Sequence, residues 1–379
     1  MLNPNLLATQ PPPVMEARRW LADANPALPL LNVSQAAPVE PPPEPLRREI
    51  ARIALDVPEA HLYGPVLGLP DLRAQVATDW TRDYGAPVAA EEVAITSGCN
   101  QAFATAISAL AAPGDEVILP TPWYFNHAMW LTQQGLRAVP LPTGDDLVPD
   151  PERAAALISP RTRAIALVTP NNPTGREYPA EILAAFLDLC RSRDIALIVD
   201  ETYRDFHSAD GPPHDLFARD WRGTLVQLYS FSKAYRLTGH RVGAMVADPA
   251  LLAQAEKVLD TVTICPNQIG QRAALWGMRN LRDWLAGERS EILARRAAVE
   301  AATLPEWEVR AAGAYFAWLR HPFDEASDAL ARRMVTEQSV LALPGTMFVP
   351  EGDPGTLRIA FANSDAAGLA DLAERLQAL

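Results

Sequence analysis

Lys233 is the residue with the clearest chemical potential, and it lies in the segment SFSKAYRLTGHRVG (residues 230–243). It is one of two lysines among 33 basic residues, the other being Lys257. A solvated surface position is a poor explanation for Lys233, because this chain uses arginine almost wherever it needs a positive charge. A lysine placed against apolar residues loses its proton more easily than in water and becomes a nucleophile toward carbonyl groups. Lys257, in LLAQAEKVLD, is typical of an exposed helix position.

Other polar and aromatic side chains also follow short apolar runs. Asp200 ends ALIVD and is followed by ETY, while PNNPTG follows RAIALVT, TPWYFNHAMW follows an apolar run, and SGCNQ follows EVAIT. Each has a simpler interpretation: a helix cap for Asp200, a turn for PNNPTG, core packing for the aromatic residues and a plain connection for the glycine turn. Together they supply an amine, a carboxylate, a flat ring, amide and phenol donors and an anion cradle. That set matches pyridoxal phosphate held as a Schiff base.

The apolar runs predict the strands that position these residues. We expect strands at 92–96, 116–120, 163–169, 196–200, 225–230 and 242–247, because most of these runs are apolar without alternation, as in strands buried on both faces. Helical patterns such as EILAAFLDLCRSRD lie between several of them. Alternating strands and helices predict an α/β open sheet, mostly parallel. Ligands bind beyond the carboxyl ends of such strands, so the candidate residues should meet there.

The rest of the chain predicts a second, smaller lobe. Residues 279–379 read as a long helix, a few strands such as GAYFAWL and TLRIAFA, and a terminal helix, which is an α+β pattern. Residues 46–278 form the large cofactor-binding domain in this interpretation. Residues 1–45 form an arm and part of the small domain. Two triple-proline runs predict that the arm is extended, and ALPLLNVSQAAPV is apolar enough that we expect it to pack on something.

Composition narrows the class of protein. The 379 residues are 49% hydrophobic and 21% charged, which is typical of a globular protein. A net charge of −13 argues against nucleic acid or an anionic membrane as the main partner. We find no apolar stretch long enough to span a membrane and no signal-peptide pattern. Cys99, Cys190 and Cys265 show neither a disulfide framework nor metal-ligand spacing, so we expect no metal and a cytoplasmic location.

The order and spacing of NNPTG, DETY and SFSKAYRLTGHRVG resemble the class I and II aminotransferases of fold type I, the aspartate aminotransferase-like group. The resemblance runs from AHLYGPVLGLPDLR to TLRIAFA, nearly the whole chain. It implies a pyridoxal 5′-phosphate enzyme that moves an amino group from an L-amino acid to a 2-oxo acid. Lys233 would be the Schiff-base lysine and would also move the proton, and Asp200 would pair with the pyridine N–H. Asn172 and Tyr203 would bind the phenolic oxygen, and Tyr124 would stack on the ring.

The resemblance also implies how the phosphate and the substrate are bound. The turn of Gly98, Cys99 and Asn100, together with Ser230 and Arg241, would hold the phosphate. Tyr63 matches a tyrosine that reaches the phosphate of the partner subunit, which implies a homodimer. Arg358 matches the arginine that clamps the substrate carboxylate. Ala36 stands where the family usually has a glycine in the arm that approaches this carboxylate.

Several alternatives stay open or fail on the residues. The same pocket in this fold can run another outcome, as a lyase, cyclase or oxidase, for example β-elimination at a C–S bond. An acyl-transfer enzyme would explain the S-x-x-K of Ser230 and Lys233, but no K-T-G accompanies it. A DNA-binding regulator would need a basic head domain, and the arm is short and not basic. For the donor, PWYFNHAMW favours a neutral or aromatic amino acid, whereas arginines 18, 19, 47 and 48 could instead bind a side-chain carboxylate.

Overall fold

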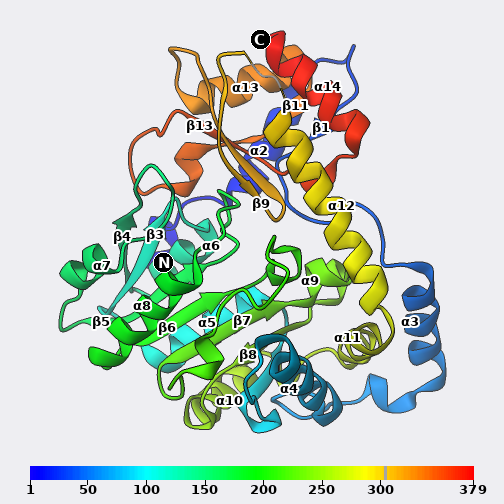
Figure 1. Cartoon of the computed structure of the whole chain (residues 1–379), viewed down its shortest axis with the longest axis vertical. Helices are drawn as coiled ribbons and strands as arrows, with labels where there is room; N and C mark the ends of the chain where they lie inside the picture. The colour runs from blue at the N-terminus through cyan, green and yellow to red at the C-terminus, as the bar shows by residue number, and fades with distance from the viewer. Residues whose placement is uncertain (303–304) are drawn as a thin grey trace.

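A seven-stranded sheet forms the centre of the computed structural model, which describes residues 1–302 and 305–379 (Figure 1). The strand order is β2-β8-β7-β6-β5-β3-β4. Its strands are β2 (Val93–Thr96), β3 (Glu116–Thr121), β4 (Arg137–Pro142), β5 (Thr162–Val168), β6 (Ala196–Asp200), β7 (Leu225–Ser230) and β8 (Gly243–Val246). All are parallel except β8, which runs antiparallel to both β2 and β7. The predicted mostly parallel α/β sheet is therefore confirmed.

Strand β4 is the one member of this sheet that we did not predict. Its sequence, RAVPLP, contains Pro140 and Pro142, and proline removes a backbone donor from the ladder. The strand lies at the sheet edge and pairs with β3 alone, so its other side needs no partner strand. The two prolines are tolerated there, because a strand at the edge pairs on one side alone.

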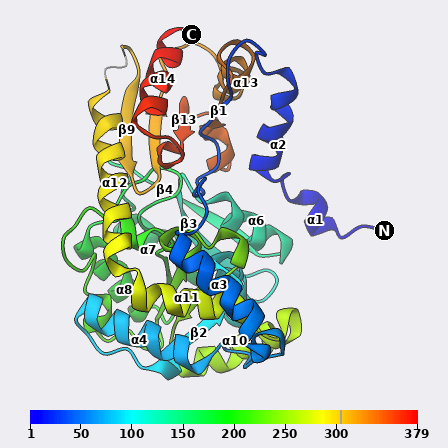
Figure 2. The ribbon, with the colours of Figure 1, turned by 90° about the vertical axis from the view of Figure 1, so that its right-hand side faces the viewer.

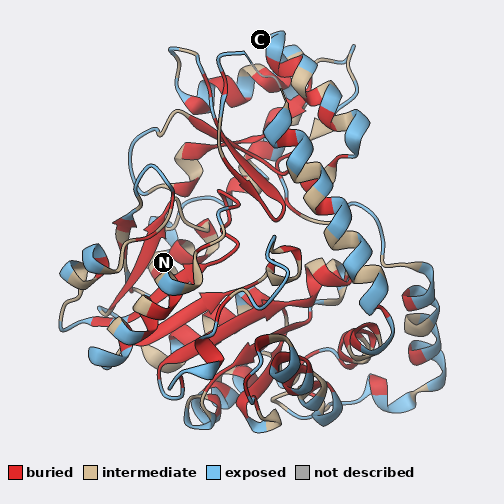
Figure 3. Ribbon diagram, in the orientation of Figure 1, coloured by how far each residue is buried: buried red, intermediate tan, exposed pale blue. Residues whose placement is uncertain are grey.

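Helices cover both faces of the sheet, and the buried strands lie between two apolar clusters (Figure 3). On one face lie α4 (Pro70–Tyr84), α8 (Ala180–Ser192) and α11 (Gln268–Asn280). On the other lie α5 (Cys99–Leu110), α6 (Phe125–Gln133) and α10 (Pro249–Thr263). Successive side chains of a strand point to opposite faces. In β6, Val199 packs in the first cluster and Ile198 in the second, which fixes the face for the residues that follow.

A second sheet, of order β12-β13-β10-β9, is antiparallel throughout. Its strands are β9 (Glu308–Gly313), β10 (Phe316–Arg320), β12 (Leu343–Pro344) and β13 (Thr356–Ile359). Around it lie α12 (Arg282–Ala301), α13 (Ser327–Gln338) and α14 (Ala366–Gln377). In Figure 1, α12 runs along one side of the molecule from the level of the large sheet to that of the small one. The predicted helix, strands and terminal helix of this region are all present.

The prediction of an extended arm is wrong for residues 4–23. This segment contains α1 (Pro4–Ala8), α2 (Pro13–Arg19) and a 3₁₀ turn (Trp20–Asp23), and α1 and α2 lie along one side of the molecule (Figure 2). Pro4 and Pro13 are each the first helical residue, a position where the missing N–H costs nothing and the fixed φ suits the helix.

The rest of the arm does pack on the body, as predicted. Val33 and Ala36 are buried, and β1 (Leu31–Asn32) pairs in parallel with β11 (Val340–Leu341). The remaining helices are α3 (Glu44–Asp56), α7 (Pro151–Leu157) and α9 (Phe231–Ala234). Within the described residues, we find no helix that combines the length and apolar character needed to cross a membrane.

Candidate active site

A cavity of about 300 Å³ opens at the carboxyl ends of β5, β6 and β7. Its wall also includes residues from the arm, from α5 and α6, and from β13 of the small sheet. The cavity brings together most of the candidate residues that the sequence suggested: Ala36, Cys99, Asn100, Tyr124, Asn172, Asp200, Tyr203, Ser230, Lys233, Arg241 and Arg358. Gly98 adjoins it through Arg241, while Tyr63 is 79% exposed on the surface.

Lys233 lies on α9, a single helical turn that begins directly after β7. Ser230, the last residue of β7, caps this turn by accepting a hydrogen bond from the Ser232 N–H. The Lys233 amine donates to the carbonyl oxygen of Ala36 in the arm, at 2.6 Å. Burial lowers the pKa of Lys233 to about 8, and the nearby Arg241 and Arg358 act in the same direction. About a tenth of this amine is therefore unprotonated, and nucleophilic, at pH 7, far more than for a lysine in water.

Asp200 ends β6 and is 3% exposed. Its Oδ1 accepts a hydrogen bond from the Thr202 N–H at 3.0 Å, and its Oδ2 lies 3.3 Å from His127 Nε2. Burial alone would raise the pKa of Asp200, but His127 and Thr202 outweigh it and hold the pKa below its usual value. The carboxylate therefore stays ionised at the floor of the cavity. The ring of Phe103 stacks on His127 with centroids 3.8 Å apart and fixes its orientation.

Arg358 reaches the cavity from β13 in the small sheet and is 2% exposed. Its Nη1 donates to Asn172 Oδ1 at 2.9 Å, and its Nη2 donates to the Ser34 carbonyl oxygen in the arm. Its buried Nε has no hydrogen-bond partner among the described residues. Burial lowers the pKa of Arg358 to about 10, which still leaves it charged. A buried guanidinium with spare donors is suited to a carboxylate ligand.

Two phenols line the cavity, and both remain protonated. Burial raises the pKa of Tyr124 to about 12 and raises that of Tyr203 well above its usual value. The Tyr124 hydroxyl donates to Asn100 Oδ1 at 3.3 Å and accepts from Asn126 Nδ2 at 2.8 Å. The Lys233 Nζ lies 5.8 Å from the ring centroid of Tyr203. The Tyr203 hydroxyl can therefore act as a hydrogen-bond donor toward a ligand, whereas Tyr124 donates its hydrogen to Asn100.

The turn before α5 forms a cradle for an anion. Gly98 has φ of 90°, which side chains rarely adopt, and a Cβ there would overlap Arg241 Nη2. Arg241 Nη1 donates to Ser232 Oγ at 3.3 Å, and its Nη2 donates to the Ser97 carbonyl oxygen at 3.4 Å. The free N–H groups and dipole at the start of α5 favour negative charge in the same place. Backbone and guanidinium donors thus converge on one corner of the cavity.

The charges lining the cavity suit a ligand with several anionic groups. Among the described residues that line it, three are cationic (Lys233, Arg241 and Arg358) and one is a carboxylate (Asp200). Arg241 lies at the Gly98 turn, where it suits a phosphate-like group. Arg358 comes from β13 of the small sheet, where it suits a carboxylate. A cationic ring nitrogen would match Asp200. The arrangement can attach a carbonyl compound to Lys233 while holding anions at two separate points.

Several residues of the site were missed in the sequence: Val14, Gln35, Phe125, Asn126, His127, Thr202 and Ser232. His127 left a usable signal, because it lies three residues after Tyr124, the N-cap of α6, and residues at that spacing lie on the same side of a helix. The signal for Gln35 is its place directly before Ala36 in NVSQAAP, a segment expected at the entrance. The arginines considered for a side-chain carboxylate are all exposed; Arg18 donates to Gln35 Oε1 at 2.7 Å, and Arg48 pairs with Glu44 on α3.

Comparison with known proteins places the chain in a family. Residues 29–376 match the model of the family "Aminotransferase class I and II". The aspartate/prephenate aminotransferase of Thermus thermophilus is 30% identical over 325 residues, covering 84% of this chain and 83% of that protein. The aromatic aminotransferase ISS1 of Arabidopsis thaliana is 27% identical over 390 residues, covering 100% and 95%. The structure of Thermus thermophilus aspartate aminotransferase with maleate superimposes with a TM-score of 0.90 at 27% identity, over 100% of this chain and 99% of that one.

Proposed function

This chain belongs to the class I and II aminotransferases, and we propose that it binds pyridoxal 5′-phosphate at Lys233 and transfers an amino group from a neutral or aromatic L-amino acid to a 2-oxo acid. One observation carries the proposal: a lysine with a lowered pKa, a buried carboxylate and two arginines share one cavity at the strand ends. The family is generally dependent on this cofactor. The residues present fit it, since the Gly98 turn leaves room for an anion that a side chain would fill and Arg358 keeps an unpartnered buried Nε.

Each part of the cavity has a role in holding the cofactor. Gly98, Cys99, Asn100, Ser230 and Arg241 would bind its phosphate. Asp200 would pair with the ring nitrogen, and Tyr124 would stack on the ring. Asn172 and Tyr203 would donate to its phenolic oxygen. Bound there, the cofactor supplies an aldehyde for amine attachment and a ring that withdraws electrons from the substrate Cα.

The chain itself supplies binding, orientation and proton transfer. Arg358 holds the substrate carboxylate, and the small side chain of Ala36 allows the arm backbone to lie beside it. Lys233 Nζ would remove the proton from the substrate Cα and later return a proton, a task suited to a pKa of about 8. Asp200, kept ionised by His127 and Thr202, stabilises positive charge on the ring nitrogen.

The preference for a neutral or aromatic donor has support in the cavity wall. Val14 and Phe125 line it beside Tyr124, and Gln35 and Asn126 add neutral polar side chains to the wall. Among the described lining residues, each cation already has a role. Relatives differ in the substrates that their names give: aspartate and prephenate, valine, arginine or aromatic amino acids. Escherichia coli YbdL, described as having a methionine aminotransferase function, superimposes with a TM-score of 0.90 at 26% identity.

We also propose a homodimer in which Tyr63 reaches the phosphate of the partner's site. The exposure of Tyr63 on one protomer supports this, as do the exposed apolar residues Leu62, Val262 and Ile264. A cytoplasmic location fits the three free cysteines. The division at residues 45 and 278 fits the positions of the two sheets.

A half-reaction tests the proposal. Purified protein loaded with pyridoxal phosphate is mixed with single amino acids and no 2-oxo acid. We expect the band of the lysine-bound cofactor to give way to that of pyridoxamine phosphate, and a 2-oxo acid to restore it. Release of ammonia or pyruvate while the first band persists would support the lyase or oxidase alternative. Conversion by aspartate or glutamate alone would contradict the neutral or aromatic donor.

A further inference from the structure

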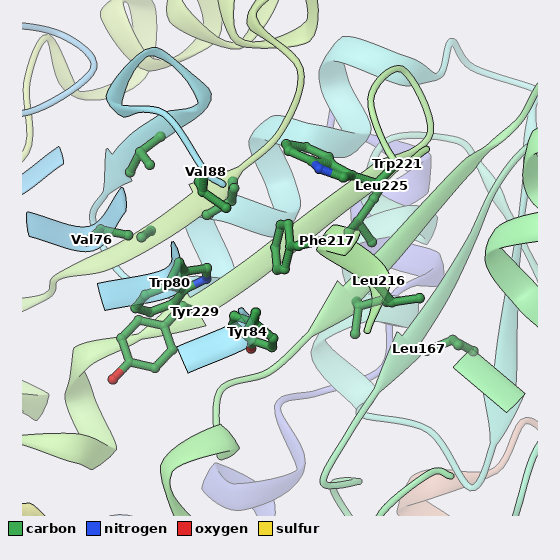
Figure 4. Close-up of a cluster of buried hydrophobic side chains, with 14 of the residues drawn as sticks. Val76, Trp80, Tyr84, Val88, Leu167, Leu216, Phe217, Trp221, Leu225 and Tyr229 are labelled. Carbon is green, nitrogen blue, oxygen red and sulfur yellow. The ribbon is translucent and has the colours of Figure 1, made fainter. Parts of the chain in front are cut away.

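Glu201 follows Asp200 directly, but its side chain lies on the opposite face of the sheet. Asp200 lies against His127 of α6, whereas the Glu201 carboxylate contacts Tyr84 of α4. Glu201 is 1% exposed. It sits beside an aromatic cluster that includes Trp80 and Tyr84 (Figure 4). The proposed function uses Asp200 and leaves this second buried carboxylate without a role.

Three side chains from separate parts of the chain converge on Glu201 Oε2. The Tyr84 hydroxyl donates at 2.7 Å, Gln227 Nε2 donates at 2.6 Å, and His214 Nε2 lies 3.1 Å away. His214 Nδ1 accepts a hydrogen bond from the Leu216 N–H at 3.3 Å, so in the neutral ring the hydrogen is on Nε2, facing the carboxylate. Glu201 Oε2 therefore accepts from two neutral donors, Tyr84 and Gln227, and has the His214 ring beside it.

A buried carboxylate of this kind is expensive to keep. Moving a charged group out of water costs several kcal/mol, which is on the order of the favourable energy from its buried partners. Replacing the charge and its partners together with apolar side chains therefore often gives a protein that is equally stable. Burial alone would raise the pKa of Glu201, but His214, Arg204 and Gln227 lower it to about 2, so the charge persists. Fold stability is thus a weak explanation for a charged residue at position 201. A role in holding the neighbouring site residues in place explains it better.

The network connects directly to the elements that carry the reacting groups. The Glu201 N–H donates to the Leu228 carbonyl oxygen at 2.9 Å, and the Glu201 carbonyl oxygen accepts from the Arg204 N–H at 3.0 Å. This turn has Asp200 on one side and Tyr203 on the other. Gln227 belongs to β7, which leads into Ser230 and Lys233, and its Oε1 accepts from Trp80 Nε1 at 2.7 Å. One carboxylate therefore joins the end of β6 to β7 and, through Tyr84, to α4.

We propose that Glu201 is a positioning residue for the reaction: held by Tyr84, Gln227 and His214, it fixes Asp200 and Tyr203 relative to Lys233. The inference rests on the proposed function, because it concerns where these three residues meet the cofactor. Glu201 itself does not touch the ligand. It acts through the turn that it anchors, from the face of the sheet that is turned away from the cavity.

The test compares Glu201 with a matched buried carboxylate far from the site. Glu116 is 3% exposed and accepts from Ser159 Oγ at 2.6 Å and Arg161 Nη2 at 2.9 Å. It is the first residue of β3, so it lies at the amino-terminal end of the parallel strands, whereas the cavity lies at their carboxyl ends. Each glutamate is changed to leucine and to glutamine. The readouts are the melting temperature, the affinity of the cofactor-free protein for pyridoxal phosphate, the pH at which the visible band of the bound cofactor changes, and kcat and KM.

We expect both leucine variants to melt earlier, but only the Glu201 variants to change the site. A displacement of about 1 Å can cost about a hundredfold in rate, so Glu201→Leu should lower kcat on that order and shift the pH of the spectral change. The KM for the amino donor should change little, since Arg358 comes from the other sheet. Glu201→Gln, which keeps an acceptor oxygen, should fall between Glu201→Leu and the unchanged protein.

The inference is overturned if Glu201→Leu is folded and matches Glu116→Leu in cofactor affinity, spectral pH and kcat. Should Glu201→Leu fail to fold, Glu201→Gln and Tyr84→Phe carry the same comparison, because the phenylalanine keeps the ring and removes one donor. An effect on melting alone in both would equally overturn it. If the unchanged protein neither binds pyridoxal phosphate nor converts an amino acid, the proposed function fails instead.

Discussion

Replacing Arg358 with lysine should separate recognition of the substrate carboxylate from the rest of the site. The guanidinium is buried, held by Asn172 and Ser34, and keeps Nε unpartnered. Lysine retains the charge but presents one nitrogen, so a two-bond contact with a carboxylate becomes a one-bond contact. A hydrogen bond to a charged group contributes about 1.5–3 kcal/mol, which predicts a loss of about 10- to 150-fold in kcat/KM for an amino acid donor.

The assay is single-turnover conversion of the bound cofactor, followed by its absorption. It is run with an amino acid and with the matching amine that lacks the carboxylate. Arg310→Lys is the control, because Arg310 belongs to the same small sheet and binds Asp145 on the surface. We expect the loss in Arg358→Lys to appear with the amino acid and to disappear with the amine. Equal losses for both donors, or an unchanged rate with the amino acid, would refute the role of Arg358 in binding the carboxylate.

Three further outcomes follow from single positions. Gly98→Ala should weaken binding of pyridoxal phosphate, since the new Cβ overlaps Arg241 at a positive φ; equilibrium dialysis that gives unchanged affinity would contradict this. In the cofactor-free protein, the rate at which Lys233 attaches an aldehyde, trapped with borohydride, should rise with pH and level off above about 8, because only the unprotonated amine reacts; a midpoint near 10.5 would show an ordinary lysine. Gly313→Ala should destabilise the fold by about 1–3 kcal/mol, because its Cβ would meet the Gly175 carbonyl oxygen, and an unchanged melting temperature would count against that contact.

The sequence predicted the part of the site that the large sheet builds. Asp200, Asn172 and Lys233 each follow an apolar run, and parallel strands bring the ends of such runs to one edge. The scarcity of lysine singled out Lys233. These inferences needed only local patterns and one topological rule, which is why the six predicted strands and most of the cavity wall agree with the structure.

The features that the sequence did not predict depend on contacts between segments that are distant along the chain. The role of Gln35 in the wall comes from the path of the arm, and the setting of Glu201 comes from Tyr84, His214 and Gln227 on three other elements. Neither neighbourhood leaves a periodic signal. The helices of the arm were missed for a different reason: proline was treated as a helix breaker, although it favours the first helical position.

The cavity is built from both sheets, so contacts between the two sheets decide how its two parts are positioned. The groups suited to the cofactor come from the large sheet, whereas Arg358 comes from β13 of the small one. Two of the contacts between them are Arg358 to Asn172, and the backbone of Gly175 against that of Gly313. Both pass through the PNNPTG turn. The turn that follows β5 therefore carries Asn172, the amide that we propose binds the cofactor, and it also contacts the small sheet. In the proposed function, this turn helps to position a substrate carboxylate at Arg358 relative to the cofactor ring.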